Sequence, residues 1–360
     1  MPSPLQYGDY LQLPKILYAQ EPVSSGQATE AHDEMLFIII HQAYELWFKQ
    51  LLFEVSSVNQ IMQKPSLNDN SPELQTVVHR LSRCATILKL LVHQIDVMET
   101  MTPMDFLDFR DLLRPASGFQ SWQFKELEAR LGLRYKDRYG QDYYVSQLTS
   151  DKIALVKQAE SENSLIDLVN AWLERMPFFE EAENWKSFPA GNAMPNEAKN
   201  KIPVFWMDYR NRYAQSLAEA ESQNLLRFDD LFMQSFQNDQ PQNMKIVAES
   251  SFSYAARRAA LFIMLYRAYP ILQLPFQLLT QLLEIDEQLS TWRYRHMSMV
   301  QRMIGTRIGT GGSSGRDYLK AALDKHYIFR EIAELTSFLI ERRRLPVLSR
   351  EMEKRLGFAG

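Results

Sequence analysis

The sequence predicts an all-α protein. Apolar residues recur every three or four positions through most of the 360-residue chain, which is the spacing of one face of an α-helix. Strand-like alternation is almost absent, since only residues 143–148 show it. Helix-capping residues stand directly before several apolar runs, as in Ser71-Pro72 and Thr102-Pro103.

Four helices are expected in the first part of the chain, at residues 31–62, 71–101, 102–114 and 119–131. Asp33 and Glu34 lie in the first turn of the first helix, where carboxylates favour the positive end of the helix dipole. Gly132 is expected to end the fourth helix. Because residues 36–40 are apolar all round, we expect other helices to enclose them.

Five more helices are expected at residues 164–175, 202–235, 252–268, 278–304 and 316–342. The helix at 278–304 is expected to start after Pro275, because proline removes a backbone hydrogen bond inside a helix. The stretch 178–201 contains Pro189, Gly191 and Pro195, which is typical of an excursion from a single domain.

Composition and charge exclude several classes of protein. A net charge of -4 provides no bulk positive field for nucleic acid or an anionic membrane. The single cysteine, Cys84, excludes an internal disulfide and indicates a reducing compartment, so we expect a cytoplasmic protein. Residues 1–7 do not resemble a secretory signal. The longest uncharged stretches, 35–44 and 268–283, are not expected to span a membrane.

His41 is a candidate site residue because no charged residue occurs between Glu34 and Glu45. An imidazole in such a dry environment needs a partner. It is either a core histidine bonded to a backbone carbonyl or part of a site, and Phe37 shares its helix face.

His296 is the second candidate. An imidazole on an apolar helix face is a standard axial ligand for haem iron, and nearby arginines are suited to pair with haem propionates. The alternative is a surface histidine in a basic patch. The other histidines suggest ordinary roles: the sequence favours a core position for His93 and surface positions for His32, His79 and His326.

Two further segments have the composition of a binding site. Phe106 and Arg110 are four residues apart, so an aromatic ring and a guanidinium face the same way and suit an aromatic ligand with a carboxylate. The alternative is a surface ion pair of Arg110 with Asp105 or Asp111. Residues 305–315 hold five of the 13 glycines, which indicates either a loop that closes over a small ligand or a flexible connector.

Several long segments together resemble the tryptophan 2,3-dioxygenase family. They follow one another in the family's order and cover most of the chain, at residues 7–11, 32–49, 106–123, 275–280 and 292–319. The resemblance implies a helical bundle that encloses haem b. With O2 as co-substrate, such an enzyme cleaves the C2–C3 bond of the indole ring of L-tryptophan to give N-formyl-L-kynurenine, the first step of the kynurenine route of tryptophan degradation.

The resemblance also implies a homotetramer, built as a dimer of dimers. Residues 1–30 would form an N-terminal arm exchanged between subunits, and residues 31–345 a single haem-binding catalytic domain that includes the excursion at 178–201. Residues 346–360 would form a C-terminal tail.

The matching motifs imply roles for individual residues. His296 resembles the axial ligand of the haem iron, and Trp292, one turn earlier, a residue that borders the haem. His41 resembles the histidine that hydrogen-bonds the indole N–H, with Phe37 beside the ring.

Arg110 resembles the arginine that binds the substrate carboxylate, and Phe106 its aromatic neighbour. Thr310 resembles the threonine that binds the ammonium group. Tyr7 and Tyr10 resemble tyrosines that reach into the neighbouring subunit's site.

Two other functions would use the same residues. A haem- or indole-binding sensor would bind without turnover, and a biosynthetic relative would oxidise a different indole, such as a ring-substituted tryptophan. The two amino-acid contacts, Arg110 and Thr310, favour an enzyme that acts on a free α-amino acid.

Overall fold

The structure is a computed structural model that describes residues 4–27, 30–139, 145–176, 203–237, 250–307, 309 and 315–357. These residues form helices and connecting loops without a β-strand, which confirms the all-α class. Residues 145–147, in the run with strand-like alternation, are helical. None of the helices in these ranges is both long and apolar enough to cross a membrane alone; one pair, Tyr254–Leu265 and Pro270–Ile304, meets that criterion together but is bent by 111°.

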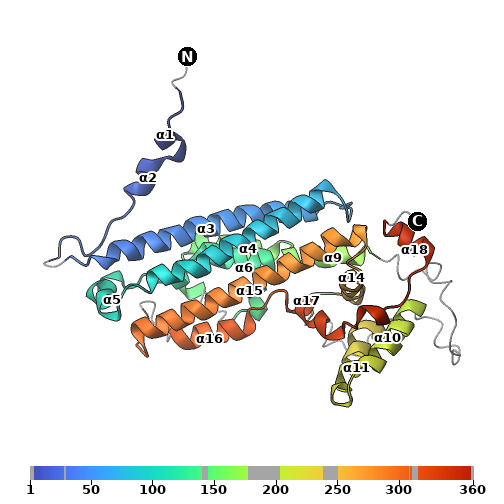
Figure 1. The fold of residues 1–360 in the computed structure, drawn as a ribbon. Helices are drawn as coiled ribbons and strands as arrows, with labels where there is room; N and C mark the ends of the chain where they lie inside the picture. Colours follow the sequence, from blue (N-terminus) through green and yellow to red (C-terminus); the bar gives the residue numbers. More distant parts are fainter. Residues whose placement is uncertain are drawn as a thin grey trace.

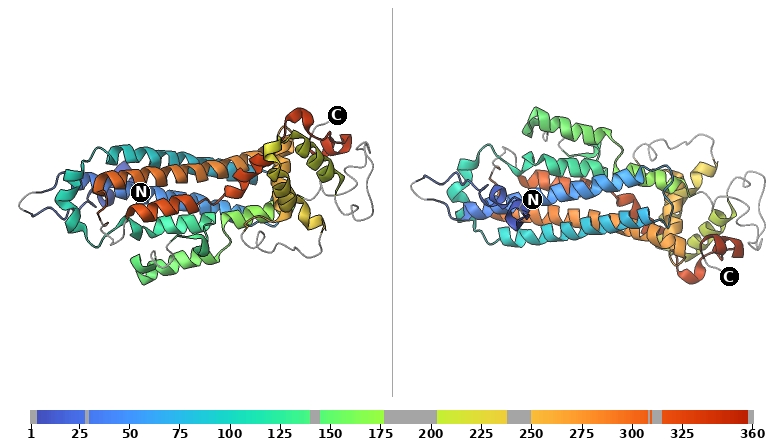
Figure 2. Two further views of the ribbon diagram at one scale, coloured as in Figure 1. Left: turned by 90° about the horizontal axis from the view of Figure 1, so that it is seen from below. Right: turned by 90° about the horizontal axis from the view of Figure 1, so that it is seen from above.

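Three long helices form the body of the molecule. These are α3 (Asp33–Met62), α4 (Pro72–Met98) and α15 (Pro270–Ile304), which lie side by side along the long axis (Figure 1). Two shorter helices, α6 (Trp122–Leu131) and α16 (Gly315–Lys325), pack against them, and Figure 2 shows the elongated shape that results. Apolar side chains fill the interior of this bundle.

N-capping residues and a helix-ending glycine fix several helix ends where they were predicted. The Ser71 hydroxyl accepts a hydrogen bond from the Leu74 backbone N–H at the start of α4. Thr102 and Asp105 form a reciprocal capping box at the start of α5 (Pro103–Arg110). Gly132 follows α6 with a φ of 135°, and a Cβ atom there would collide with Ile166.

Other predicted bounds were wrong. The range 202–235 is broken: α10 (Val204–Ser216) stops where Leu217 is extended, and α11 (Gln223–Phe228) leads through a π-helical turn into α12 (Gln234–Gln237). The range 316–342 is also broken, because α16 ends at Lys325 before α17 (Arg330–Glu334). Helical spacing of apolar residues continues through such short breaks, so the pattern alone conceals them.

The long helix α15 starts before Pro275 rather than after it. Pro270 occupies its first turn, where the missing N–H is not needed, and Pro275 follows in the second turn at the cost of one backbone hydrogen bond. Two helices complete this part of the fold. The helix α9 (Leu165–Glu174) lies where it was predicted, whereas α8 (Ser150–Ser161), which packs on α6, was not predicted.

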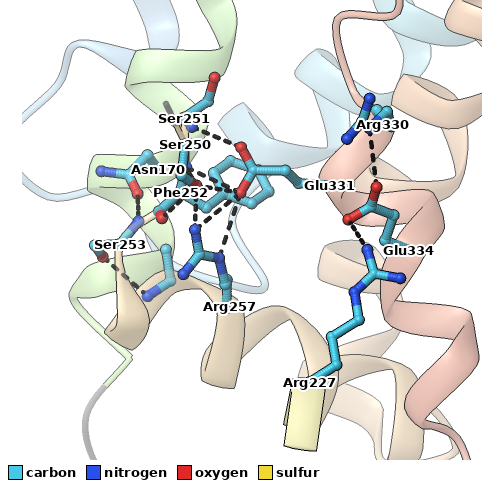
Figure 3. A network of polar contacts seen from close by, with 11 residues as sticks. Asn170, Arg227, Ser250, Ser251, Phe252, Ser253, Arg257, Arg330, Glu331 and Glu334 are labelled. Carbon is cyan, nitrogen blue, oxygen red and sulfur yellow. Dashed lines mark hydrogen bonds and ion pairs between the residues drawn. The ribbon is translucent and has the colours of Figure 1, made fainter. Parts of the chain in front are cut away.

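A polar network lies in the half of the molecule away from α5. It joins α9, the start of α14 (Tyr254–Leu265) and α17 (Figure 3). Glu331 accepts a hydrogen bond from the Ser251 N–H at 2.6 Å and pairs with Arg257 at 3.3 Å. Glu334 pairs with Arg227 of α11 at 2.8 Å. Because α17 is tied to helices that are distant in sequence, this part of the molecule is stabilised by tertiary contacts.

The N-terminal segment projects away from the bundle as an arm (Figure 1). It carries two short helices, α1 (Tyr7–Leu11) and α2 (Leu13–Leu17), which bury no side chain in the single chain. The base of the arm is fixed, since the buried carboxylate of Glu34 accepts hydrogen bonds from the backbone N–H groups of Val23 and Ser24, both at 2.9 Å. At the other terminus, α18 (Arg350–Arg355) is the last helix described.

Candidate active site

A pocket of about 280 Å³ lies inside the bundle. Its walls come from α3, α4, α5, α6, α15 and α16, so segments from most of the chain meet around it. Six of the nine predicted site residues line it: Phe37, His41, Phe106, Arg110, Trp292 and His296. A buried pocket with several convergent polar groups is the usual form of a small-molecule site.

One wall of the pocket is aromatic. The ring centroid of Phe37 lies 5.7 Å from that of Phe106 and 5.5 Å from that of Phe109. Phe106 and Phe109 pack edge to face at 5.4 Å. This apolar surface suits a planar aromatic ligand. Phe109 was not predicted as a site residue, because the helical period does not reveal which neighbouring helix a given face will meet.

His41 presents a neutral imidazole to the pocket. Its Nδ1 lies 2.7 Å from the carbonyl oxygen of Phe37 and donates to it, which leaves Nε2 as the acceptor of the ring. Desolvation lowers the pKa of His41 below its ordinary value, although the Phe37 carbonyl and Glu45 oppose this shift. His41 bonds a backbone carbonyl, as one interpretation of the sequence expected, but it lines the pocket instead of lying in the core. Its role in a site stays a prediction.

Arg110 is buried at the pocket, with 4% of its surface exposed. The alternative of a surface ion pair is wrong. Asp105 instead caps α5, and Asp111 pairs with the exposed Arg114 at 3.3 Å. A guanidinium beside an apolar wall is suited to bind the carboxylate of an aromatic ligand.

His296 lies on α15 in the same pocket, so the interpretation as a surface histidine is wrong. Its Nδ1 is buried and has no hydrogen-bond partner within the described ranges. Desolvation, with a smaller contribution from His41, lowers the pKa of His296 to about 4. The ring is therefore neutral at pH 7, which is the form that binds a metal ion.

Aromatic packing holds His296 in place. Its ring stacks on Trp292, with centroids 5.1 Å apart and planes 14° apart. Trp292 in turn packs against Phe124 at 5.0 Å and Tyr44 at 6.1 Å. The Tyr44 hydroxyl donates to the Leu91 carbonyl oxygen of α4 at 2.7 Å. Tyr44 and Phe124 were not predicted as site residues, because their sequence neighbours suggest only core packing.

The donor set around the pocket decides which kind of metal group fits. No three His, Cys, Asp or Glu side chains cluster as possible metal ligands in the described residues. A metal ion at His296 would therefore need a group that supplies its remaining ligands, as a porphyrin does. The neutral imidazole, the buried Nδ1 without a partner and the apolar walls all fit such a group.

A buried ionic cluster, which was not predicted, forms another part of the pocket. Glu128 of α6 pairs with Arg138 and with Arg293 of α15, each at 2.7 Å. Arg293 also donates to the His326 carbonyl oxygen at 3.0 Å. Lys125, one turn before Glu128, is buried and lines the pocket. On a short helix rich in charge, a sequence pattern does not distinguish such residues from a solvated face.

The burial of two histidines outside the predicted site, His93 and His326, was predicted wrongly. The side chain of His93, expected in the core, is 76% exposed and lies 3.7 Å from Asp96. His326, expected on the surface, is 4% exposed because α16 carries it into the ionic cluster beside Glu128. Neighbouring residues in the sequence therefore indicated the environment of these two side chains incorrectly.

Two predicted site residues are not brought to the pocket of the described chain. Tyr7 and Tyr10 lie on the arm and are 74% and 70% exposed. Thr310 lies outside the described residues, although Gly309 beside it lines the pocket. The predicted excursion at 178–201 also lies outside the described ranges.

The fold and the site together define a class: an all-α protein whose bundle contains an apolar pocket with two neutral imidazoles and a buried guanidinium. Comparison with known proteins specifies the class further. The model of the family described as tryptophan 2,3-dioxygenase matches residues 2–339. This chain belongs to the tryptophan 2,3-dioxygenase family.

Relatives from distant organisms agree with this assignment. The chain is 45% identical to a tryptophan 2,3-dioxygenase of Bdellovibrio bacteriovorus and 44% identical to one of Alteromonas mediterranea, covering 99% of this chain and 98% of each relative. It is 41% identical to the tryptophan 2,3-dioxygenase of Rattus norvegicus, over 96% of this chain and 84% of the relative.

Proposed function

We propose that this protein is a haem-dependent dioxygenase that cleaves the C2–C3 bond of the indole ring of L-tryptophan with O2 to give N-formyl-L-kynurenine. The observation that carries the proposal is the meeting of His41, Arg110 and His296 around one pocket, in a chain of this family. His296 would hold haem b, with Trp292 stacked on its ring. When bound, the haem supplies the redox-active iron needed for chemistry with O2.

The other residues position the substrate. Nε2 of His41 would accept a hydrogen bond from the indole N–H, since Nδ1 already donates to Phe37. Phe37 and Phe106 would pack on the indole ring. Arg110 would bind the carboxylate, and Thr310 the ammonium group. Orientation, rather than proton transfer, is then the main contribution of these side chains.

Turnover tests the proposed reaction. The protein, reconstituted with haemin and reduced, should show a tryptophan-dependent rise in absorbance from N-formylkynurenine under air. A haem- or indole-binding sensor would bind tryptophan without this rise. An enzyme for another indole would oxidise a compound such as 2-methylindole better than tryptophan. Either result would refute the proposed reaction.

Replacing Arg110 tests the carboxylate contact. We expect Arg110→Ala to raise the apparent dissociation constant for tryptophan about 10- to 100-fold, because a charge-assisted hydrogen bond contributes about 1.5–3 kcal/mol. Binding of tryptamine, which lacks the carboxylate, should change little. Arg114→Ala, which removes an exposed guanidinium nearby, is the matched control. An unchanged affinity for tryptophan would exclude the contact.

We also propose a homotetramer, a dimer of dimers, in which the arm of residues 1–30 brings Tyr7 and Tyr10 to a neighbouring subunit. Apolar side chains of α3 that are exposed in the single chain support the proposed homotetramer. Residues 36–40 are enclosed as expected except at Ile39, which is 48% exposed in the single chain, and α3 continues an exposed stripe with Leu46 and Phe53. We expect the assembly to be cytoplasmic.

A further inference from the structure

A second cavity lies at the surface of the molecule, at the turn between α14 and α15. It has a volume of about 370 Å³, and the short 3-10 helix η9 (Arg342–Arg344) also contributes to its lining. No described residue lines both this cavity and the pocket of His296. Because an α-helix rises about 1.5 Å per residue, Gln273 at this cavity and His296 lie roughly 35 Å apart along α15. The cavity is therefore separate from the proposed active site, and it has the size of a small-molecule site.

Two arginines from distant parts of the chain line this second cavity. Arg267 lies in the turn that follows α14, and Arg342 is the first residue of η9. Neither guanidinium forms an ion pair with a carboxylate among the residues that the structure describes. Glu341, the residue before Arg342, instead pairs with Arg343 and, at 3.7 Å, with Arg344. Within the described ranges, two cations therefore face one cavity without an anionic partner.

An aromatic ring restrains one of these two guanidinium groups. The Cζ atom of Arg267 lies 4.8 Å from the ring centroid of Phe276, which also lines the cavity. A side chain that is already restrained loses less conformational entropy when it binds a ligand. Gln273 and Gln277 lie one turn apart on α15, so their amides can donate and accept hydrogen bonds on the same wall. The cavity thus combines two charged donors with a ring and two amides.

We propose that this cavity binds a phosphate monoester of a small organic molecule, with the phosphate between Arg267 and Arg342. At pH 7 such a phosphate carries a charge of about -1.5 to -2, which matches two cations. Its three terminal oxygens can accept hydrogen bonds from two guanidinium groups at once, whereas a carboxylate has two oxygens and one charge. A phosphate ion alone leaves room in about 370 Å³, so the organic group lies against Phe276 and the two glutamine amides. The inference goes beyond the proposed function and does not require haem.

Calorimetric titration of the full chain with matched probes tests the proposed ligand class. Phenyl phosphate should bind saturably, with one site per chain, at pH 7 and low salt. Methyl phenyl phosphate, a diester with a single negative charge, should bind about 10-fold more weakly, because one charge-assisted contact loses its counterpart. Inorganic phosphate should also bind more weakly than phenyl phosphate, because it lacks the organic group. If inorganic phosphate or the dicarboxylate phthalate binds as tightly as phenyl phosphate, the proposed ligand class is wrong.

Variants locate the site. Arg267→Gln and Arg342→Gln should each raise the dissociation constant for phenyl phosphate about 10-fold and leave tryptophan turnover unchanged. Arg343→Gln is the matched control, because it removes a neighbouring guanidinium that pairs with Glu341 and does not line the cavity. It should bind phenyl phosphate as the wild type does.

Two results would refute the site: a wild type that binds no phenyl phosphate, or binding that Arg110→Ala weakens and Arg267→Gln does not. Tight binding of phenyl phosphate by a protein that does not turn over tryptophan would refute the proposed function alone.

Discussion

The His296→Ala variant should bind haem at least about 100-fold more weakly than the wild type and should lose tryptophan turnover. His296 is the imidazole in the pocket whose buried Nδ1 has no partner in the described ranges, and its ring is neutral at pH 7. Changes to groups that only support a metal ligand already cost roughly 10- to 100-fold in affinity, so loss of the ligand should cost more. Absorbance of the haem band and the haem-to-protein ratio after gel filtration measure the effect.

His93→Ala is the matched control, because it removes an imidazole that is 76% exposed and lies away from the pocket. It should keep the haem content and turnover of the wild type. Free imidazole added to His296→Ala should restore part of the haem binding, which separates a missing ligand from a misfolded pocket. A His296→Ala variant with a normal ferric spectrum and normal turnover would show that another residue binds the iron.

The Glu128→Gln variant should have a free energy of unfolding about 3–5 kcal/mol lower than the wild type. Its carboxylate is 3% exposed and pairs with both Arg138 and Arg293, so the substitution leaves two buried guanidinium groups with less countercharge. Chemical denaturation of the haem-free protein at pH 7 measures this loss. Glu126→Gln, on the same helix, removes a single pair with Arg130 and should cost less than about 1 kcal/mol.

The Glu128 carboxylate should also make the free energy of unfolding depend on pH. Burial alone would raise the pKa of Glu128, but the His326 side chain 3.6 Å away and the charges of Arg138 and Arg293 outweigh it and hold the pKa well below 4.5. The folded state therefore binds fewer protons than the unfolded state as the pH falls below about 4.5. This contribution is present above that pH and is lost as the pH falls through the folded-state pKa. Glu128→Gln should lack this part of the acid sensitivity, and an unchanged pH profile would contradict the assignment.

Local sequence signals predicted the helices whose ends carry strong caps or stops. Ser71, the Thr102 capping box and Gly132 all act where they were expected, because each satisfies or ends backbone hydrogen bonds within a few residues. The breaks in the ranges 202–235 and 316–342 were missed. There the apolar spacing continues, and contacts such as those of Glu331 with the start of α14 fix where the chain turns.

The sequence by itself determined the all-α class and the chemistry available at His41, Arg110 and His296, because helical spacing and residue type are local properties. Only the tertiary structure decided that these three side chains meet in one pocket, that His326 is buried while His93 faces solvent, and that Lys125 and Glu128 lie inside the bundle. The physical reason is that a helical period gives the face on which a residue lies but not what that face contacts. Burial and ionic pairing depend on helices that are far apart in the chain.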